Sequence, residues 1–278
     1  MVKLTDNLND DQLTALFADV QVFKAVYPTM ETYESAIGQI TNPLKKETFR
    51  RLDDWFAPRM AGMWATISGS HRTIDSEFVN DNANVVRATL DHGIGVLNGD
   101  APGADFVSNE VTLDYLSNRK MDPKDHLALI LPTRKDIWME RLSHVAVSNH
   151  TSPEERSKAY SVNGQLRYII KNWPEIVFDD YPEKYIDENR FLREGEDGDE
   201  YRQEVYQARN GLLAYKGDIF IGLRVNESRG VEHNRDIAEK LERPNLIEEY
   251  QIDQDGSDAI TDYDTELRIP EISRRSYI

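Results

Sequence analysis

Short continuous runs of apolar residues alternate with stretches of helical periodicity from residue 63 onward. The apolar runs cover residues 63–67, 94–97, 127–131 and 218–223. Apolar residues at helical spacing follow in 75–92, 104–117 and 232–241. Continuous apolar runs are typical of parallel strands that are covered on both faces. The alternation therefore predicts an α/β fold, a Rossmann-like parallel sheet of about five strands with helices on both faces, and 244–250 as a last edge strand.

The segments on either side of this pattern, and within it, differ from it. Helical spacing over 9–27, 30–40 and 43–56 predicts that residues 1–60 form a helical N-terminal extension, which packs on the core or makes a dimer. The Rossmann-like nucleotide-binding domain then spans 61–252 and holds an insertion at about 134–205. We expect this insertion to be loop-rich, with helices at 153–172 and 199–214, and to be either a lid or irregular surface. Residues 253–278 form an acidic tail.

The amino-acid composition limits the classes of molecule that we expect the protein to bind. The chain has 278 residues and a formal net charge of −17. Because no broad basic field is present, nucleic acid is disfavoured as the main partner, although a local basic pocket stays open. The absence of cysteine excludes disulfides and thiolate metal sites, and the six histidines show no metal-ligand spacing. We therefore expect no metal and no resident cofactor. No apolar stretch resembles a signal peptide or a membrane span, so a soluble cytoplasmic protein is expected.

Candidate ligand-binding residues follow the predicted strands in short polar loops. Three loops hold them: Ser68-Gly69-Ser70-His71-Arg72, the stretch from Asn98 to Asp105, and Ser228-Arg229-Gly230-Val231. A fourth stretch, Arg209-Asn210, ends the helical pattern before the strand at 218–223 or lies within it. Loops after parallel strands share the carboxyl edge of the sheet, where open α/β folds bind ligands. Glycines let backbone N–H groups approach a phosphate, and arginines offer forked donors. The candidate ligand-binding residues are Gly69, Ser70, Arg72, Gly99, Asp100, Gly103, Asp105, Asn210, Ser228, Arg229 and Gly230, with Arg209 beside them. The aspartates could accept hydrogen bonds from ribose hydroxyls.

These four motifs, in this order, resemble the SLOG superfamily. That superfamily contains Rossmann-like proteins related to the DNA-processing protein DprA and to the LOG phosphoribohydrolases, and the chain is most similar to the YspA-type branch. The resemblance covers about two fifths of the chain, roughly 63–133 and 205–250. It implies a nucleotide or nucleotide-derived ligand at the carboxyl edge of the sheet.

In LOG enzymes, an arginine and a glutamate hydrolyse the N-glycosidic bond of a nucleoside 5′-monophosphate. Arg209 matches the arginine position. Asn234 takes the glutamate position, counting from Gly230, and Glu232 lies two residues early. The Gly-Gly pair of the family motif is replaced by Glu227-Ser228.

Two functions from different classes remain open. As an enzyme, the protein would hydrolyse an N-glycosidic bond, with Arg209 and Glu232 as catalytic residues, or with Asp100 in place of Glu232 to stabilise positive charge on the sugar. As a binding module, it would sense a nucleotide and act through its N-terminal helices or through a homo-oligomer. The structural alternatives are that Arg209 pairs with acidic neighbours and that Asp105 caps a helix or braces its loop. Trp138, Trp173 and the tyrosines of 181–206 either stack on a base or pack within the insertion.

Overall fold

We describe the fold from a computed structural model, which covers residues 2–23, 29–59, 62–69, 76–149, 151–226 and 228–251. The acidic tail predicted at 253–278 lies outside these residues. The end of the first predicted helix, 24–27, lies outside them as well.

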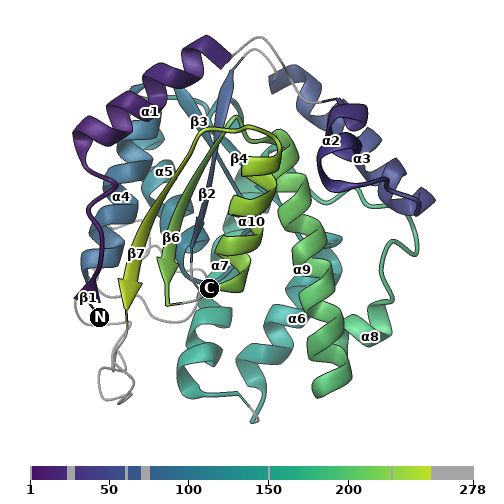
Figure 1. The fold of residues 1–278 in the computed structure, drawn as a ribbon. Helices are drawn as coiled ribbons and strands as arrows, with labels where there is room; N and C mark the ends of the chain where they lie inside the picture. Colours follow the sequence, from purple (N-terminus) through teal and green to yellow (C-terminus); the bar gives the residue numbers. More distant parts are fainter. Residues whose placement is uncertain are drawn as a thin grey trace.

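The core is one sheet in which six strands run parallel, with a short antiparallel strand at one margin (Figure 1). The order is β1-β7-β6-β2-β3-β4-β5. The strands are β1 Val2–Lys3, β2 Met63–Gly69, β3 Ile94–Asn98, β4 Leu127–Ile130, β5 Val177–Phe178, β6 Ile219–Val225 and β7 Asn245–Gln251. The α/β class is therefore confirmed, with more strands than the five expected. The strand predicted at 244–250 is present as β7, but its predicted place at the edge of the sheet is wrong, because β1 pairs outside it, with Val2 opposite Gln251.

The order of strands reverses beside β2. From β2 the chain moves outward through β3, β4 and β5, and it then returns to place β6 on the other side of β2. Ala65 of β2 is in register with Val96 of β3 and with Ile219 of β6. The carboxyl ends of β2 and β6 thus form the topological switch point, which is where open α/β sheets hold their ligands.

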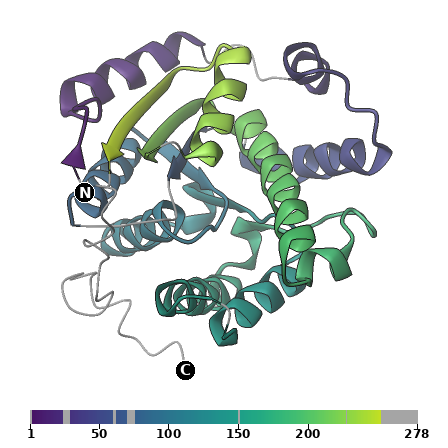
Figure 2. The same cartoon turned by 60° about the horizontal axis from the view of Figure 1, so that its bottom comes forward.

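Helices cover both faces of the sheet (Figures 1 and 2). One face carries α1 Asp10–Phe23, α4 Ser76–Asp91, α5 Ala104–Arg119, α6 Lys135–Val147 and α7 Pro153–Asn172. The other carries α2 Met30–Ile37, α3 Pro43–Phe56, α9 Glu196–Lys216 and α10 Arg229–Lys240. A short helix, α8 Glu188–Leu192, precedes α9. Helix α2 ends before the predicted residue 40, because Gly38 adopts a φ of 101°.

The N-terminal residues are joined to the sheet on both faces. Phe17 of α1 is buried in the core of one face, and Leu52 of α3 is buried in the core of the other. The carboxylate of Glu248 on β7 accepts hydrogen bonds from the Thr5 hydroxyl and from the backbone N–H groups of Asn7 and Leu8, each at 2.8 Å. Residues before the first central strand therefore complete the core of this fold as well as extending it.

The insertion is mostly helical, so its prediction as loop-rich is wrong. The helix predicted at 153–172 is present with these bounds, since Ser152 caps it and Glu155 bonds back to the cap. Helix α9 begins three residues earlier than predicted, at Glu196. Helix α6 was not predicted, although Trp138 and Leu142 pack into the core. The helices of the insertion stand beside the carboxyl edge of the sheet and build one side of a cleft.

Candidate functional site

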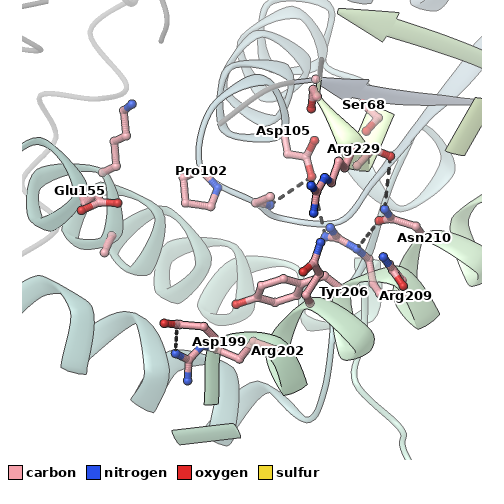
Figure 3. A pocket seen from close by; sticks show the side chains of 18 of the residues that line it. Ser68, Pro102, Asp105, Glu155, Asp199, Arg202, Tyr206, Arg209, Asn210 and Arg229 are labelled. Carbon is pink, nitrogen blue, oxygen red and sulfur yellow. Dashed lines mark hydrogen bonds and ion pairs between the residues drawn. The ribbon is translucent and has the colours of Figure 1, made fainter. Parts of the chain in front are cut away.

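A cleft of about 1810 Å³ opens at the topological switch point (Figure 3). Its inner end is formed by the end of β2 at Ser68 and Gly69, by the loop before α5, and by the first turn of α10. Helix α9 lines it over its length, and α6 and α7 form the outer half. The cleft thus joins three of the predicted loops to the insertion.

Arg209 lies at the inner end and is held by the glycine loop. It projects from α9, and its side chain is nearly buried. Its Nη1 donates to the carbonyl oxygen of Gly99 at 2.6 Å, and its Nε donates to the side-chain oxygen of Asn210 at 3.1 Å. A Cβ on Gly99 would lie 1.7 Å from Nη1, so the glycine is required by the position of the guanidinium. The side chain is therefore fixed before any ligand arrives.

Asp105 braces the glycine loop. Its Oδ2 accepts from the backbone N–H groups of Gly99 and Ala101, each at 3.0 Å, and lies 4.0 Å from Nη1 of Arg209. Burial raises the pKa of Asp105, and Arg209 with the two N–H groups opposes the rise. Because its Oδ2 holds two N–H groups of the loop, Asp105 shapes the inner end of the cleft.

Two helices begin at the cleft without a side-chain cap. Helix α5 starts after Gly103, which has a φ of 99°, and α10 starts after Ser228. Neither preceding residue caps the helix with its side chain. The N–H groups of a first turn that lack such a cap, together with the helix dipole, make a place for an anion. Asn210 ties the second helix to the site, since its Nδ2 donates to the carbonyl oxygen of Gly230 at 3.4 Å.

Asp100 lies behind the cleft and does not line it. Its side chain is fully buried and accepts from Nε1 of Trp138 at 3.2 Å and from Nδ2 of Asn109 at 3.4 Å. Burial raises the pKa of this carboxyl well above its ordinary value, and the charge of Asp105 adds to the rise, whereas the Trp138 N–H and Arg209 oppose it. Asp100 therefore links the glycine loop to α6 and is not positioned to contact a ligand.

Glu232 does not line the cleft and is engaged in ion pairs, one of them with Arg224, which does line it. Its Oε2 lies 2.7 Å from Nη1 of Arg224, and its Oε1 contacts Arg235. Asn234 is buried beside the end of β2, where its Nδ2 donates to the Ser68 hydroxyl at 3.1 Å. Its Oδ1 has no hydrogen-bond partner among the described residues.

The predicted site residues thus divide into four groups. Those that line the cleft are Gly69, Asp105, Arg209, Asn210, Ser228, Arg229 and Gly230. Gly99, Asp100 and Gly103 lie in the loop behind its wall, and Glu232 lies apart. Ser70 and Arg72 lie outside the described residues. Gly69 also has a packing role, because a Cβ there would lie 2.4 Å from the Cβ of Ala104 at the start of α5.

The outer half of the cleft was not predicted as a site. Its cationic side chains are Arg141 on α6, Lys158 on α7 and Arg202 on α9. Tyr206 lies between Arg202 and Arg209 on the same helix (Figure 3). Its ring packs edge-on against Trp138. The spacing of Arg202, Tyr206 and Arg209 places them on one helical face, and this was the available sequence signal.

Comparisons with known proteins do not identify a family. No family model matches the chain, and neither the search of curated proteins nor the search of solved structures returns a match. Among the described residues, no group of three or more histidines and carboxylates is arranged to hold a metal ion. No helix in the described part of the chain is both long and apolar enough to span a membrane.

Proposed function

We propose that the cleft binds a nucleotide or nucleotide-derived ligand and that the protein acts as a non-catalytic nucleotide-sensing module. The observation that carries the proposal is the convergence of two helix N-termini without side-chain caps, those of α5 and α10, around the fixed guanidinium of Arg209. This convergence occurs at the switch point between β2 and β6. Helix N-termini and arginine together form a preorganised site for a phosphate group.

The remaining groups of the cleft suit a nucleoside. Tyr206 offers an aromatic face beside the arginine, and Asn210, Gln203 and Gln207 offer amide donors and acceptors on the same helix. Stacking on an aromatic ring and hydrogen bonds to amides are ordinary means of holding a base and its sugar. Arg229, at the exposed start of α10, adds a second forked donor at the rim.

The two carboxylates that the sequence suggests for catalysis, Glu232 and Asp100, are engaged elsewhere, which favours binding over hydrolysis. Cleavage of an N-glycosidic bond needs a carboxylate beside the sugar, where positive charge develops. Glu232 is held by Arg224 and Arg235, and Asp100 is covered by Trp138. Hydrolysis of a nucleoside monophosphate in the manner of LOG enzymes is the alternative function, and it would require Glu232 to leave its ion pairs.

Paired binding and turnover measurements test this proposal. We expect nucleoside 5′-monophosphates to raise the melting temperature, with the matching nucleosides giving a smaller rise, because a ligand that binds the folded state stabilises it by mass action. Arg209→Gln should weaken binding measured by calorimetry at least tenfold, since a charge-assisted hydrogen bond contributes about 1.5–3 kcal/mol. Arg193→Gln, which removes an exposed arginine that pairs with Asp197 on α9, is the matched control.

Two further results decide between the functions. Release of free base, followed by chromatography, would establish hydrolysis, and its loss in Glu232→Gln would assign the carboxylate. Binding without release supports the sensing module, for which sedimentation should show a change of oligomeric state on addition of ligand. Absence of binding by every nucleotide would overturn the proposal.

A further inference from the structure

The cleft is larger than one nucleotide requires. Small-molecule pockets commonly have volumes of about 300–1,000 Å³, whereas this cleft encloses about 1810 Å³. The proposed phosphate site occupies only the inner end, around Arg209 and the starts of α5 and α10. The outer half, between α6, α7 and α9, holds a second set of charged side chains that the proposed function does not use.

The cations of the outer half are buried, and their partners are exposed. The side chains of Arg141, Lys158 and Arg202 are 11%, 5% and 5% exposed. Their acidic partners Glu194, Glu154 and Asp199 are 49%, 36% and 69% exposed in the same order. A buried cation is held in place by its surroundings, whereas an exposed carboxylate can rotate into water at little cost. These carboxylates therefore neutralise fixed cations and can be replaced by an anion from outside.

Arg202 differs from the other two cations of the outer half in its role. Arg202 already donates to the carbonyl oxygens of Phe191 and Arg193, so it supports the turn before α9. Arg141 makes its ion pair with Glu194 through Nη1, at 3.2 Å. Lys158 makes its pair with Glu154 one turn earlier on α7.

Tyr206 lies between the two groups of cations. The guanidinium groups of Arg141, Arg202 and Arg209 all oppose the rise in its pKa that burial causes, so its hydroxyl is within reach of the charges at both ends. Along α9, Arg202 and Arg209 are separated by two helical turns, or about 10 Å. A ligand that lies along this face of α9 would contact the ring of Tyr206 between the two arginines.

We propose that the cleft binds a two-ended anionic ligand of dinucleotide size, with one phosphate at Arg209 and a second anionic group at Arg141 and Lys158. This inference rests on the proposed function, which supplies the inner phosphate. The second anion displaces Glu194 and Glu154 from their ion pairs, and the part of the ligand between the two anions lies against Tyr206. Selectivity for a two-ended ligand follows, because a mononucleotide leaves the outer pairs intact.

Calorimetry with three ligands tests the outer subsite separately from the inner one. The ligands are a nucleoside 5′-monophosphate, the linear 5′-phosphorylated dinucleotide, and the same dinucleotide with an added 3′-phosphate, all with the base that binds best. In the wild-type protein we expect the added 3′-phosphate to tighten binding about tenfold, the lower end of what a charge-assisted hydrogen bond contributes, since the ligand must displace existing pairs. Arg141→Gln should reduce this ratio to about one while leaving the affinity for the monophosphate unchanged.

Two further variants keep the test decisive if Arg141→Gln folds poorly. Glu194→Gln removes the competing carboxylate and should raise the ratio several-fold, an effect that loss of folding cannot produce. Arg193→Gln, on an exposed arginine beside the cleft, should leave the ratio as in the wild type. Equal affinity of the wild type for the two dinucleotides would overturn the outer subsite while the monophosphate still binds. Absence of binding by all three ligands would instead overturn the proposed function, and the subsite with it.

Discussion

Replacing Gly99 by alanine should displace Arg209 and destabilise the protein through that single contact. The φ of Gly99 is not positive, so alanine can adopt the same backbone conformation. The three atoms nearest to the added Cβ all belong to Arg209, with Nη1 at 1.7 Å, Cζ at 2.3 Å and Nε at 2.7 Å. Because no real contact is so short, the guanidinium must move.

The size of the effect follows from what Arg209 loses. Moving the guanidinium breaks its 2.6 Å hydrogen bond to the Gly99 carbonyl, a charge-assisted bond of about 1.5–3 kcal/mol. It also strains its packing, which costs about 1 kcal/mol or more. Alanine returns about 0.5 kcal/mol by restricting the unfolded chain. We therefore expect a net loss of about 3 kcal/mol in the free energy of unfolding, and a fall of roughly 5–10 °C in the melting temperature.

A double-mutant cycle in urea isolates the contact. In an Arg209→Ala background the clash is absent, so Gly99→Ala should be neutral or stabilise by about 0.5 kcal/mol, and the coupling energy should be about 3 kcal/mol. Gly230→Ala, at the other loop of the cleft, serves as the control, because its Cβ would lie 4.0 Å from the nearest atom. An equal loss in both backgrounds would refute the reasoning.

Three other changes test the surrounding structure. Since the folded-state pKa of Asp100 is raised, its contribution to stability is greatest below its ordinary value of 3.8 and falls as pH rises toward the folded pKa. Asp100→Asn should therefore gain stability relative to the wild type as pH rises from about 4 to about 8 in urea titrations. If the difference in free energy of unfolding between the two proteins did not change with pH, the raised pKa of Asp100 would be contradicted. Gly69→Ala should cost about 2–3 kcal/mol in thermal unfolding, because its Cβ would meet that of Ala104, and an unchanged melting temperature would show that α5 can shift. Glu248→Ala leaves the N–H groups of Asn7 and Leu8 without an acceptor, so amide exchange should accelerate over residues 2–8, and unaltered exchange would place the N-terminal anchor elsewhere.

Local signals explain which elements could be predicted from the sequence. The central strands are continuous apolar runs, and helices α3 and α7 carry complete start signals, with Asn42 before Pro43 and Ser152 before Pro153. Helix α6 has no side-chain cap at Arg134, so nothing in the sequence marked its start. The strands β1 and β5 are two residues long and exist only because a longer strand pairs with them.

The same distinction applies to the site. Glycine loops after strands could be recognised because their chemistry is local, and the structure brings described residues of all three loops, together with Arg209-Asn210 of α9, to one cleft. The burial of Asp100 could not be predicted, because the residue that covers it, Trp138, lies 38 positions along the chain on an unpredicted helix. Arg141 and Lys158 resemble ordinary solvated charges in the sequence. Only the packing of α6 and α7 against the core turns them into buried cations.

The charge of the cleft differs in sign from the charge of the chain. Among the described residues that line it, six are arginine or lysine and five are aspartate or glutamate, whereas the whole sequence has 33 basic and 50 acidic residues. A nucleic acid polymer would extend beyond the cleft and meet repulsion from the net negative charge of the chain. A short anion inside the cleft responds mainly to groups within a Debye length of about 8–10 Å, which here include five arginines and a lysine as well as the five carboxylates. For the ligand proposed above, the acidic excess of the chain therefore favours a small anion over a polymer of the same chemistry.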